Sequence, residues 1–491
     1  MEHPHLIMIV ADQLRCDVLG KGFTPHIDAL AREGVNFANT YCASPLCVPA
    51  RGALFTGLCP ATNGSRINPW LAQDAAAGQV HEGTPNLYAL MERGGWDCLH
   101  SGKQHFFTEG GKLEDDPATK TKWLSTDQSY AAFLAANGKR TPGGPRFRTP
   151  VPELAGGAHT RLCNYSNAET GLYEEGPDYY FDGYFTDCAL RGLRERDMAK
   201  PLFLSAMFLA PHPPFDIPDP WYSRYAAKDV HLPENVGHWY PYQSPLQMYN
   251  LTGVVGSRYT LPQWREAWRV YMGLVSLLDD CVGRLLEELK RQEIYEDSLI
   301  VFTADHGEML GSHRLFQKMC MYEESARVPL YMRFPHGAHD GTHVQRAVSH
   351  MDVLPTLCRS LAIPAPVCEG ISLHPLWEGT DALPPRDIFI QFDGNGALSN
   401  FQRCIVRENY KLIADIFKDE VYFELYDTKL DPQEKVNLLF GPSVPSVAYS
   451  MLQSLLEHIR STHDSVLLPQ TDLKAFVNAY RPLAAAQGAI V

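Results

Sequence analysis

Residues 6–10 read Leu-Ile-Met-Ile-Val, and the apolar run stops at Asp12. Five consecutive apolar residues are typical of a strand that is buried on both faces of a sheet. Residues 202–208 are predicted to form a further buried strand, and residues 96–101 and 298–303 also read as short strands. Helical patterns separate them, the longest over residues 264–293. This alternation predicts an α/β fold with a large mixed, mostly parallel sheet flanked by helices.

The pattern changes after a Pro-rich segment at residues 379–386. The apolar runs that follow are short and predict antiparallel strands, at residues 387–392, 404–406 and 410–414. A helix is expected over residues 447–462. We therefore expect a catalytic domain over residues 1–380 and a smaller C-terminal α+β domain, built on a short antiparallel sheet, over residues 387–491. Residues 110–200 are rich in Gly, Pro, Asp and Tyr and only weakly periodic, so we expect long surface excursions there.

The overall charge excludes some classes of partner. The chain carries 43 basic and 57 acidic side chains among its 491 residues, a formal net charge of -14. An acidic surface repels nucleic acid and anionic membranes, so we expect neither as a partner. The N-terminal apolar run is too short for a signal peptide, and no run approaches the ~20 residues of a membrane span. We therefore expect a cytoplasmic protein whose 12 cysteines are reduced.

The segment from Cys47 to Gly57 reads Cys-Val-Pro-Ala-Arg-Gly-Ala-Leu-Phe-Thr-Gly. Pro49 suits the first turn of a helix, so Cys47 is predicted at a helix N-terminus, where free amides and the macrodipole favour an anion. Arg51 lies one turn further on and can face back to hold negative charge at residue 47. A cysteine before a helix is usually a small buried hydrophobe, so this segment gains its meaning from the others.

Two polar clusters follow predicted strands. Asp12 and Gln13 come after the first strand, and Asp305 and His306 come after the strand at residues 298–303. Open α/β sheets bind ligands at the carboxyl ends of their strands, and a carboxylate beside an amide offers hard oxygen ligands to a cation. Taken alone, the first cluster is as consistent with a solvated loop as with a metal site.

Together these segments resemble the sulfatase family, within the alkaline phosphatase superfamily, and the related phosphonate monoester hydrolases. Cys-x-Pro-x-Arg followed by Leu54, Thr56 and Gly57 is similar to the family signature. Other segments resemble recurrent family motifs, at residues 102–106, 210–214, 303–318, 349–357 and 424–434. The resemblance therefore runs from about residue 5 to residue 440.

The resemblance implies that Cys47 is oxidised to formylglycine by a formylglycine-generating or anaerobic sulfatase-maturating enzyme. One oxygen of the hydrated aldehyde would attack sulfur, and the second would then help to expel sulfate. Lys103 would contact the substrate, and Lys318 would contact its sulfate group. His105 would orient or deprotonate the hydrate, and His212 would protonate the leaving alcohol. The implied catalytic set is Cys47, Arg51, Lys103, His105, His212 and Lys318.

The metal ligands implied by the resemblance are Asp12, Gln13, Asp305, His306 and the modified Cys47. Most family members carry two acids where this chain has Asp12 and Gln13, although an Asp-Gln pair is found in some sulfatases and in phosphonate monoester hydrolases. The amide removes one negative charge, and a histidine ligand favours transition metals. We expect one divalent ion, Ca²⁺ first, with Mn²⁺ and Mg²⁺ as alternatives.

The expected function is hydrolysis of a sulfate ester, with a small sulfated saccharide as substrate. A phosphonate monoester or phosphodiester hydrolase on the same scaffold is the alternative, because the metal motifs fit both. A non-enzymatic carbohydrate-binding relative with an unmodified Cys47 is a third hypothesis, which the retention of every catalytic match disfavours. The sequence leaves the oligomeric state open, a homo-oligomer included.

Overall fold

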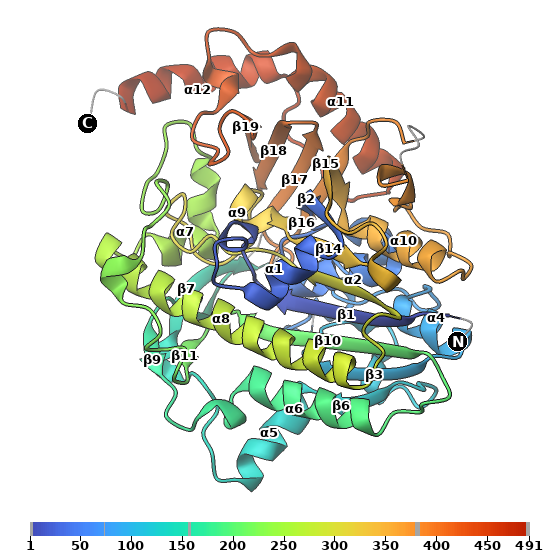
Figure 1. Ribbon diagram of the computed structural model, residues 1–491. Coiled ribbons are helices and arrows are strands. Elements are labelled where there is room, and N and C mark those ends of the chain that lie inside the picture. The colour runs from blue at the N-terminus through green and yellow to red at the C-terminus, as the bar shows by residue number, and fades with distance from the viewer. Residues whose placement is uncertain (1–2, 73, 156–158, 379–382, 488–491) are drawn as a thin grey trace.

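The computed structural model describes residues 3–72, 74–155, 159–378 and 383–487 (Figure 1). Among these residues, one sheet of nine strands has the order β13-β2-β14-β12-β1-β10-β3-β6, with β15 paired to β2. Its strands are β1 (His5–Asp12), β2 (Val35–Tyr41), β3 (Asp97–Gly102), β6 (Lys122–Ser125), β10 (Leu202–Pro211), β12 (Ser298–Ala304), β13 (Arg327–Val328), β14 (Leu330–Arg333) and β15 (Thr342–Ser349). The neighbours β12-β1-β10-β3-β6 all run parallel, whereas β14 is antiparallel to both β12 and β2. The prediction of a large mixed, mostly parallel sheet is confirmed.

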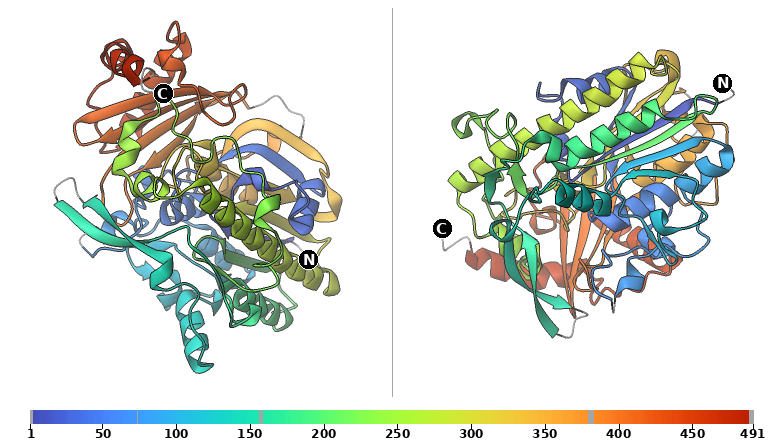
Figure 2. Two further views of the ribbon diagram at one scale, coloured as in Figure 1. Left: turned by 90° about the vertical axis from the view of Figure 1, so that its left-hand side faces the viewer. Right: turned by 90° about the horizontal axis from the view of Figure 1, so that it is seen from below.

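Helices cover both faces of this sheet (Figure 2). One face carries α1 (Pro25–Arg32), α6 (Phe181–Arg194) and α8 (Leu261–Arg291), and the other carries α2 (Cys47–Thr56), α4 (Leu87–Gly94) and α10 (Val353–Ser360). Successive side chains of a strand point to opposite faces. Ile7 and Ile9 of β1 therefore pack with the first set of helices, and Met8 and Val10 pack with the second. Burial on both faces explains the unbroken apolar run.

Part of residues 110–200 belongs to the core, so the prediction of surface excursions is wrong there. Strand β6 closes one edge of the main sheet, and α6 packs against β3, β10 and α8. Asp182 weakens the apolar periodicity of α6, yet it is fully buried because its carboxylate accepts hydrogen bonds from the backbone N–H groups of Leu209 and Ala210. The paired strands β7 (Arg148–Ala155) and β8 (His159–Ser166) do project from the body (Figure 2).

The C-terminal part carries a second, antiparallel sheet in the order β16-β17-β18-β19. Its elements are β16 (Ile388–Phe392), β17 (Phe401–Arg407), β18 (Tyr410–Phe417), β19 (Glu420–Asp427), α11 (Ser446–Ser461) and α12 (Leu473–Gln487). One face, with Ile390 and Cys404, packs into the main core, and the other, with Leu412 and Phe423, packs under α11 and α12. The expected short antiparallel sheet is confirmed. The domain limits at 380 and 387 stay a prediction, and residues 379–382 lie outside the described part of the chain.

The remaining elements are short, apart from α5. They are α3 (Pro60–Asn63), α5 (Asp127–Ala136), α7 (Leu251–Gly256), α9 (Glu323–Ala326), β4 (Phe107–Thr108), β5 (Gly111–Lys112), β9 (Thr170–Leu172) and β11 (Phe215–Ile217). Across the described ranges, no helix combines the length and the apolar character that crossing a bilayer requires.

Candidate active site

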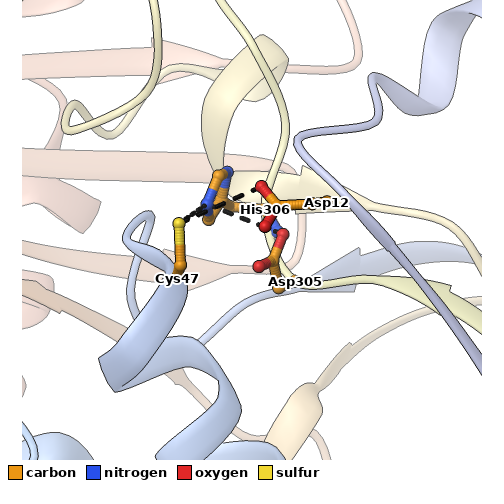
Figure 3. A group of neighbouring side chains, drawn as sticks. All are labelled: Asp12, Cys47, Asp305 and His306. Carbon is orange, nitrogen blue, oxygen red and sulfur yellow. Dashed lines mark hydrogen bonds and ion pairs between the residues drawn. The ribbon is translucent and has the colours of Figure 1, made fainter. Parts of the chain in front are cut away.

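Three segments that are far apart in sequence meet beside the carboxyl ends of β1 and β12 (Figure 3). Asp12 is the last residue of β1, Asp305 and His306 follow β12, and Cys47 begins α2. One ligand atom from each of these four side chains lies within 4.8 Å of the other three, and all four side chains are buried. The structure thus brings together four of the five side chains expected to hold a metal ion.

Cys47 lies at the N-terminus of α2, as the position of Pro49 predicts. Its Sγ is 3.2 Å from Nε2 of His306 and 4.0 Å from Nζ of Lys103. Burial and Asp12 oppose ionisation of the thiol, but Lys103, Lys318 and His306 outweigh them and lower the pKa of Cys47. Cationic side chains and a helix N-terminus therefore surround the residue that is expected to carry the nucleophile.

Arg51 links the two carboxylates of this cluster. Its Nε donates to Oδ2 of Asp305 at 3.1 Å, a terminal nitrogen lies 3.3 Å from Oδ2 of Asp12, and the other donates to the carbonyl of Lys103 at 2.8 Å. Burial alone would raise the pKa of Asp12, but Lys103, His212 and Arg51 hold it well below its usual range. Asp12 is therefore anionic, and the carboxylate of Asp305 lies beside it on the same guanidinium group. The hydrogen bonds of Arg51 go to these carboxylates and to the carbonyl of Lys103, so its charge acts on residue 47 through space.

Gln13, the fifth expected ligand, lies beside the cluster and is fully buried. Its Oε1 accepts a hydrogen bond from Nζ of Lys318 at 2.7 Å, and its Nε2 donates to Glu308. The backbone of Gln13 has a φ of 68°, a left-handed conformation that few residues other than glycine adopt. The amide of Gln13 is thus held between a cation and a carboxylate, and its role as a metal ligand stays a prediction.

Lys103 and His105 follow β3, as their motif predicts. Nζ of Lys103 forms an ion pair with Asp12. Burial, Lys103 and Arg51 lower the pKa of His105 well below its ordinary value, so its imidazole is neutral. Among the described residues, none forms a hydrogen bond with the buried Nδ1 of His105. A neutral ring with one unpaired nitrogen is suited to accept a proton or a hydrogen bond from a bound group.

His212 lies on the loop that follows β10 and faces Lys318. Its Nε2 is 3.2 Å from Nζ of Lys318, and its Nδ1 bonds to the carbonyl of Pro213. The carbonyl can only accept, so Nδ1 carries the ring proton and Nε2 accepts from the ammonium. Burial, with Lys318 next, lowers the pKa of His212 well below its ordinary value. All six expected catalytic residues therefore lie in or beside one cluster.

Sequence reasoning missed some contributors. Oδ1 of Asn68 accepts from the backbone N–H of Val48 at 3.3 Å, at the start of α2. The half-exposed ring of Trp70 lies edge-on to His105, with centroids 5.3 Å apart. Asn68 and Trp70 both lie in a loop without a sequence pattern that could have pointed to them. Glu308 was not missed: it belongs to the motif at residues 303–318, where a supporting or surface role is expected rather than direct catalysis, and it is the partner of Gln13.

Comparison with known proteins identifies the family. The sulfatase family model matches residues 4–362, and a model described as N-sulphoglucosamine sulphohydrolase, C-terminal, matches residues 311–461. The first match covers most of the chain and includes every residue of the cluster. The chain therefore belongs to the sulfatase family, a family of sulfuric ester hydrolases in the alkaline phosphatase superfamily.

Individual relatives span nearly the whole chain. A multifunctional alkaline phosphatase superfamily protein of Trinickia caryophylli is 29% identical over 95% of this chain and 97% of its own length. An N-acetylglucosamine-6-O-sulfatase of Bacteroides thetaiotaomicron is 23% identical over 90% of this chain and 82% of its own. The crystal structure of a phosphonate monoester hydrolase of Agrobacterium radiobacter superposes with a TM-score of 0.75 at 23% identity, covering 94% of this chain and 96% of that one. This last likeness confirms the fold.

Proposed function

We propose that the protein hydrolyses a carbohydrate sulfate ester, using formylglycine at position 47 and one divalent metal ion. The observation that carries the proposal is the convergence of the Cys47 thiol with Asp12, Asp305 and His306 at the N-terminus of α2. In the sulfatase family, a cysteine in this motif is the one that becomes formylglycine.

The side chains present fit a divalent ion. Asp12, Asp305 and Gln13 offer oxygen atoms and His306 offers an imidazole nitrogen, a donor set that suits Ca²⁺, Mg²⁺ or Mn²⁺. Both carboxylates are buried and form ion pairs with Arg51. The protein therefore holds charged groups at this site without contact with bulk water. When bound, the ion would polarise a sulfate oxygen as a Lewis acid. Ca²⁺ remains the first expectation.

The cationic side chains account for recognition of the sulfate group. Lys103 and Lys318 flank Cys47 and both lower its pKa, so both ammonium groups act on the position of the nucleophile. Sulfate oxygens gain negative charge as the ester bond breaks, and fixed ammonium groups in a buried site stabilise that charge. Arg51 contributes by holding Asp12 and Asp305 in place.

The two histidines divide the proton transfers. His105 has an unpaired Nδ1 and a lowered pKa, and it is proposed to accept a proton from the hydroxyl groups on residue 47. His212 is proposed to protonate the leaving alcohol through Nε2. Negative charge beside an imidazole raises its pKa, so a sulfate group bound between Lys318 and His212 would favour the protonated ring.

The proposal that the substrate is a sulfated saccharide is based on the similar proteins. The N-acetylglucosamine-6-O-sulfatase aligns with 90% of this chain, and the C-terminal model takes its name from a hydrolase of N-sulphoglucosamine. The maturation enzyme is the one partner that the proposal requires. It can be of the formylglycine-generating or the anaerobic type.

Two measurements test the proposal. Mass spectrometry of the peptide around Cys47, from protein made with a maturation enzyme, should show the mass of formylglycine. Turnover of a sulfated N-acetylglucosamine, an aryl sulfate and an aryl phosphonate monoester should then favour the sulfates in kcat/KM. Active protein with only an intact thiol would contradict the nucleophile. A preference for the phosphonate ester would establish the alternative function.

A further inference from the structure

The side-chain amide of Gln13 lies between a hydrogen-bond donor and a hydrogen-bond acceptor. Nζ of Lys318 can only donate a hydrogen bond, and it approaches one end of the amide at 2.7 Å. The carboxylate of Glu308 approaches the other end and, when ionised, can only accept. These partners fix which end of the amide is oxygen and which is nitrogen. The carbonyl oxygen therefore faces Lys318, and the NH₂ group faces Glu308.

The backbone of Gln13 is also held. Its N–H donates to Oδ1 of Asp305 at 3.1 Å, and its carbonyl accepts from the hydroxyl of Tyr271 at 2.9 Å. The peptide groups on both sides of Gln13 are thus tied to buried groups. The orientation of its side-chain amide then decides whether oxygen or nitrogen is presented to the site.

Glu308 is fixed independently of Gln13. Its Oε1 accepts from the backbone N–H of Leu310 at 2.8 Å and from that of Gln317 at 2.6 Å. Its side chain is fully buried, so water does not compete for these bonds. The second oxygen, Oε2, is left for Gln13. Glu308 therefore accepts hydrogen bonds at both of its oxygens.

We propose that Glu308 is a positioning residue that orients the amide of Gln13 with its carbonyl oxygen toward the metal site. The inference rests on the proposed function, because it assigns a task to Glu308 only if the cluster around Asp12 and Asp305 holds an ion. An amide nitrogen is a poor metal ligand and an amide oxygen a good one. Glu308 thus acts on the ion through Gln13 without touching it.

Glu308→Gln turns this arrangement around. The single oxygen of the new amide is claimed by the two backbone N–H groups, so its NH₂ group faces Gln13. Two NH₂ groups cannot bond to each other, so the Gln13 amide loses the partner that holds its nitrogen away from Lys318. If the amide flips to meet the new NH₂ group, its own NH₂ group faces the ammonium of Lys318, which can only donate, so neither orientation satisfies both neighbours. A carboxylate at position 13 would relieve the conflict, since it accepts at both ends.

The experiment is a double-mutant cycle on full-length apoprotein. Binding of Mn²⁺ alone is measured by calorimetry for the wild type, Gln13→Glu, Glu308→Gln and the double variant. Glu424→Gln serves as the matched control, because Glu424 is an equally buried glutamate that accepts three hydrogen bonds in the C-terminal sheet. Thermal unfolding without metal reports whether each variant folds.

Glu308→Gln should weaken Mn²⁺ binding about 10–100-fold, the usual effect of losing a residue that orients a ligand. Glu424→Gln should bind like the wild type. The effect of Gln13→Glu on Mn²⁺ affinity should be at least about tenfold more favourable in the Glu308→Gln background than in the wild type. Additive effects at the two positions, or wild-type affinity in a folded Glu308→Gln protein, would overturn the positioning role alone. A wild-type apoprotein that binds no divalent ion would overturn the proposed metal site instead.

Discussion

Nζ of Lys318 lies 3.2 Å from Nε2 of His212, closer than two positively charged groups would remain. The imidazole is therefore neutral, consistent with its lowered pKa. A sulfate group that binds Lys318 introduces negative charge at this contact, so substrate binding itself favours protonation of His212. Under the proposed function, this contact would couple binding of the sulfate group at Lys318 to protonation of His212.

His212→Ala separates substrates by their leaving groups. A sugar alkoxide needs a proton as it leaves, whereas an aryl oxide is stable as its anion. General acid catalysis typically supplies ~10²–10⁴-fold, so kcat on a sugar sulfate should fall by about that factor. On an activated aryl sulfate the loss should be much smaller. Steady-state kinetics on both substrates measure the difference.

Equal losses on the two substrates would mark His212 as a binding or structural residue and would make His105 the next candidate acid. His231→Ala is a suitable control, because this histidine is exposed and lies outside the cluster. It should leave both substrates unaffected.

Asp305→Asn should abolish metal binding and turnover together. Asp305 supplies a carboxylate to the cluster and bonds to Arg51, and its Oδ1 also accepts from the backbone N–H of Gln13. An ion that binds only the folded state stabilises it by about 2.7 kcal/mol at 100 times its Kd. Divalent ions should therefore raise the Tm of the chelated wild type but leave that of Asp305→Asn unchanged. Asp187→Asn, at an exposed ion pair with Arg284, should respond like the wild type. A metal-dependent rise in the Tm of Asp305→Asn would contradict the ligand assignment.

The convergence of Asp12 with Asp305 and His306 could be predicted because each segment follows a buried strand expected in the same mostly parallel sheet, although the sequence does not show that the two strands are neighbours. Both segments end buried parallel strands, and β1 and β12 are neighbours in the sheet, so their carboxyl ends coincide. Cys47 could be added from its motif and its place at a helix start. This much of the site depends on strand ends, which apolar runs reveal.

Other features depend on contacts without a sequence pattern. Whether Glu308 faces Gln13 is decided by the turns of residues 308–318, where Leu310, His313 and Gln317 adopt positive φ although none is glycine. Helix α6 escaped prediction because the buried Asp182 interrupts its apolar face. In both cases a polar side chain is paired inside the protein, and the sequence does not show its partner.

Glu424→Gln should change the pH dependence of stability. Burial raises the pKa of Glu424 to about 7, so the folded state keeps a proton that the unfolded state releases above about pH 4.3. The free energy of unfolding therefore falls as the pH rises from about 4.3 to about 7, and ionisation of Glu424 causes no further change above that range. Glutamine cannot ionise, so the Glu424→Gln variant does not lose this stability as the pH rises. The variant should gain on the order of 3 kcal/mol relative to the wild type between pH 4 and pH 8.

Urea unfolding at several pH values measures this gain. Glu420→Gln changes an exposed carboxylate on the same strand. Its free energy of unfolding should differ from that of the wild type by the same amount at every pH. Parallel stability curves for the wild type and Glu424→Gln would contradict a raised pKa at this position.

Cys47→Ser should convert the enzyme into one that reacts once. A serine hydroxyl at the start of α2 keeps the position of the nucleophile and the cationic surroundings of Lys103 and Lys318. It can attack sulfur and release the alcohol, which leaves a sulfate ester on residue 47. The formylglycine hydrate has a second hydroxyl on the same carbon that expels sulfate, and serine has none. A burst of one alcohol per protein should therefore be followed by no turnover, and intact mass spectrometry should show the added sulfo group. Cys368→Ser, at a half-buried thiol outside the cluster, should turn over like the wild type. Sustained turnover by Cys47→Ser would show that a single hydroxyl suffices and would remove the reason for formylglycine.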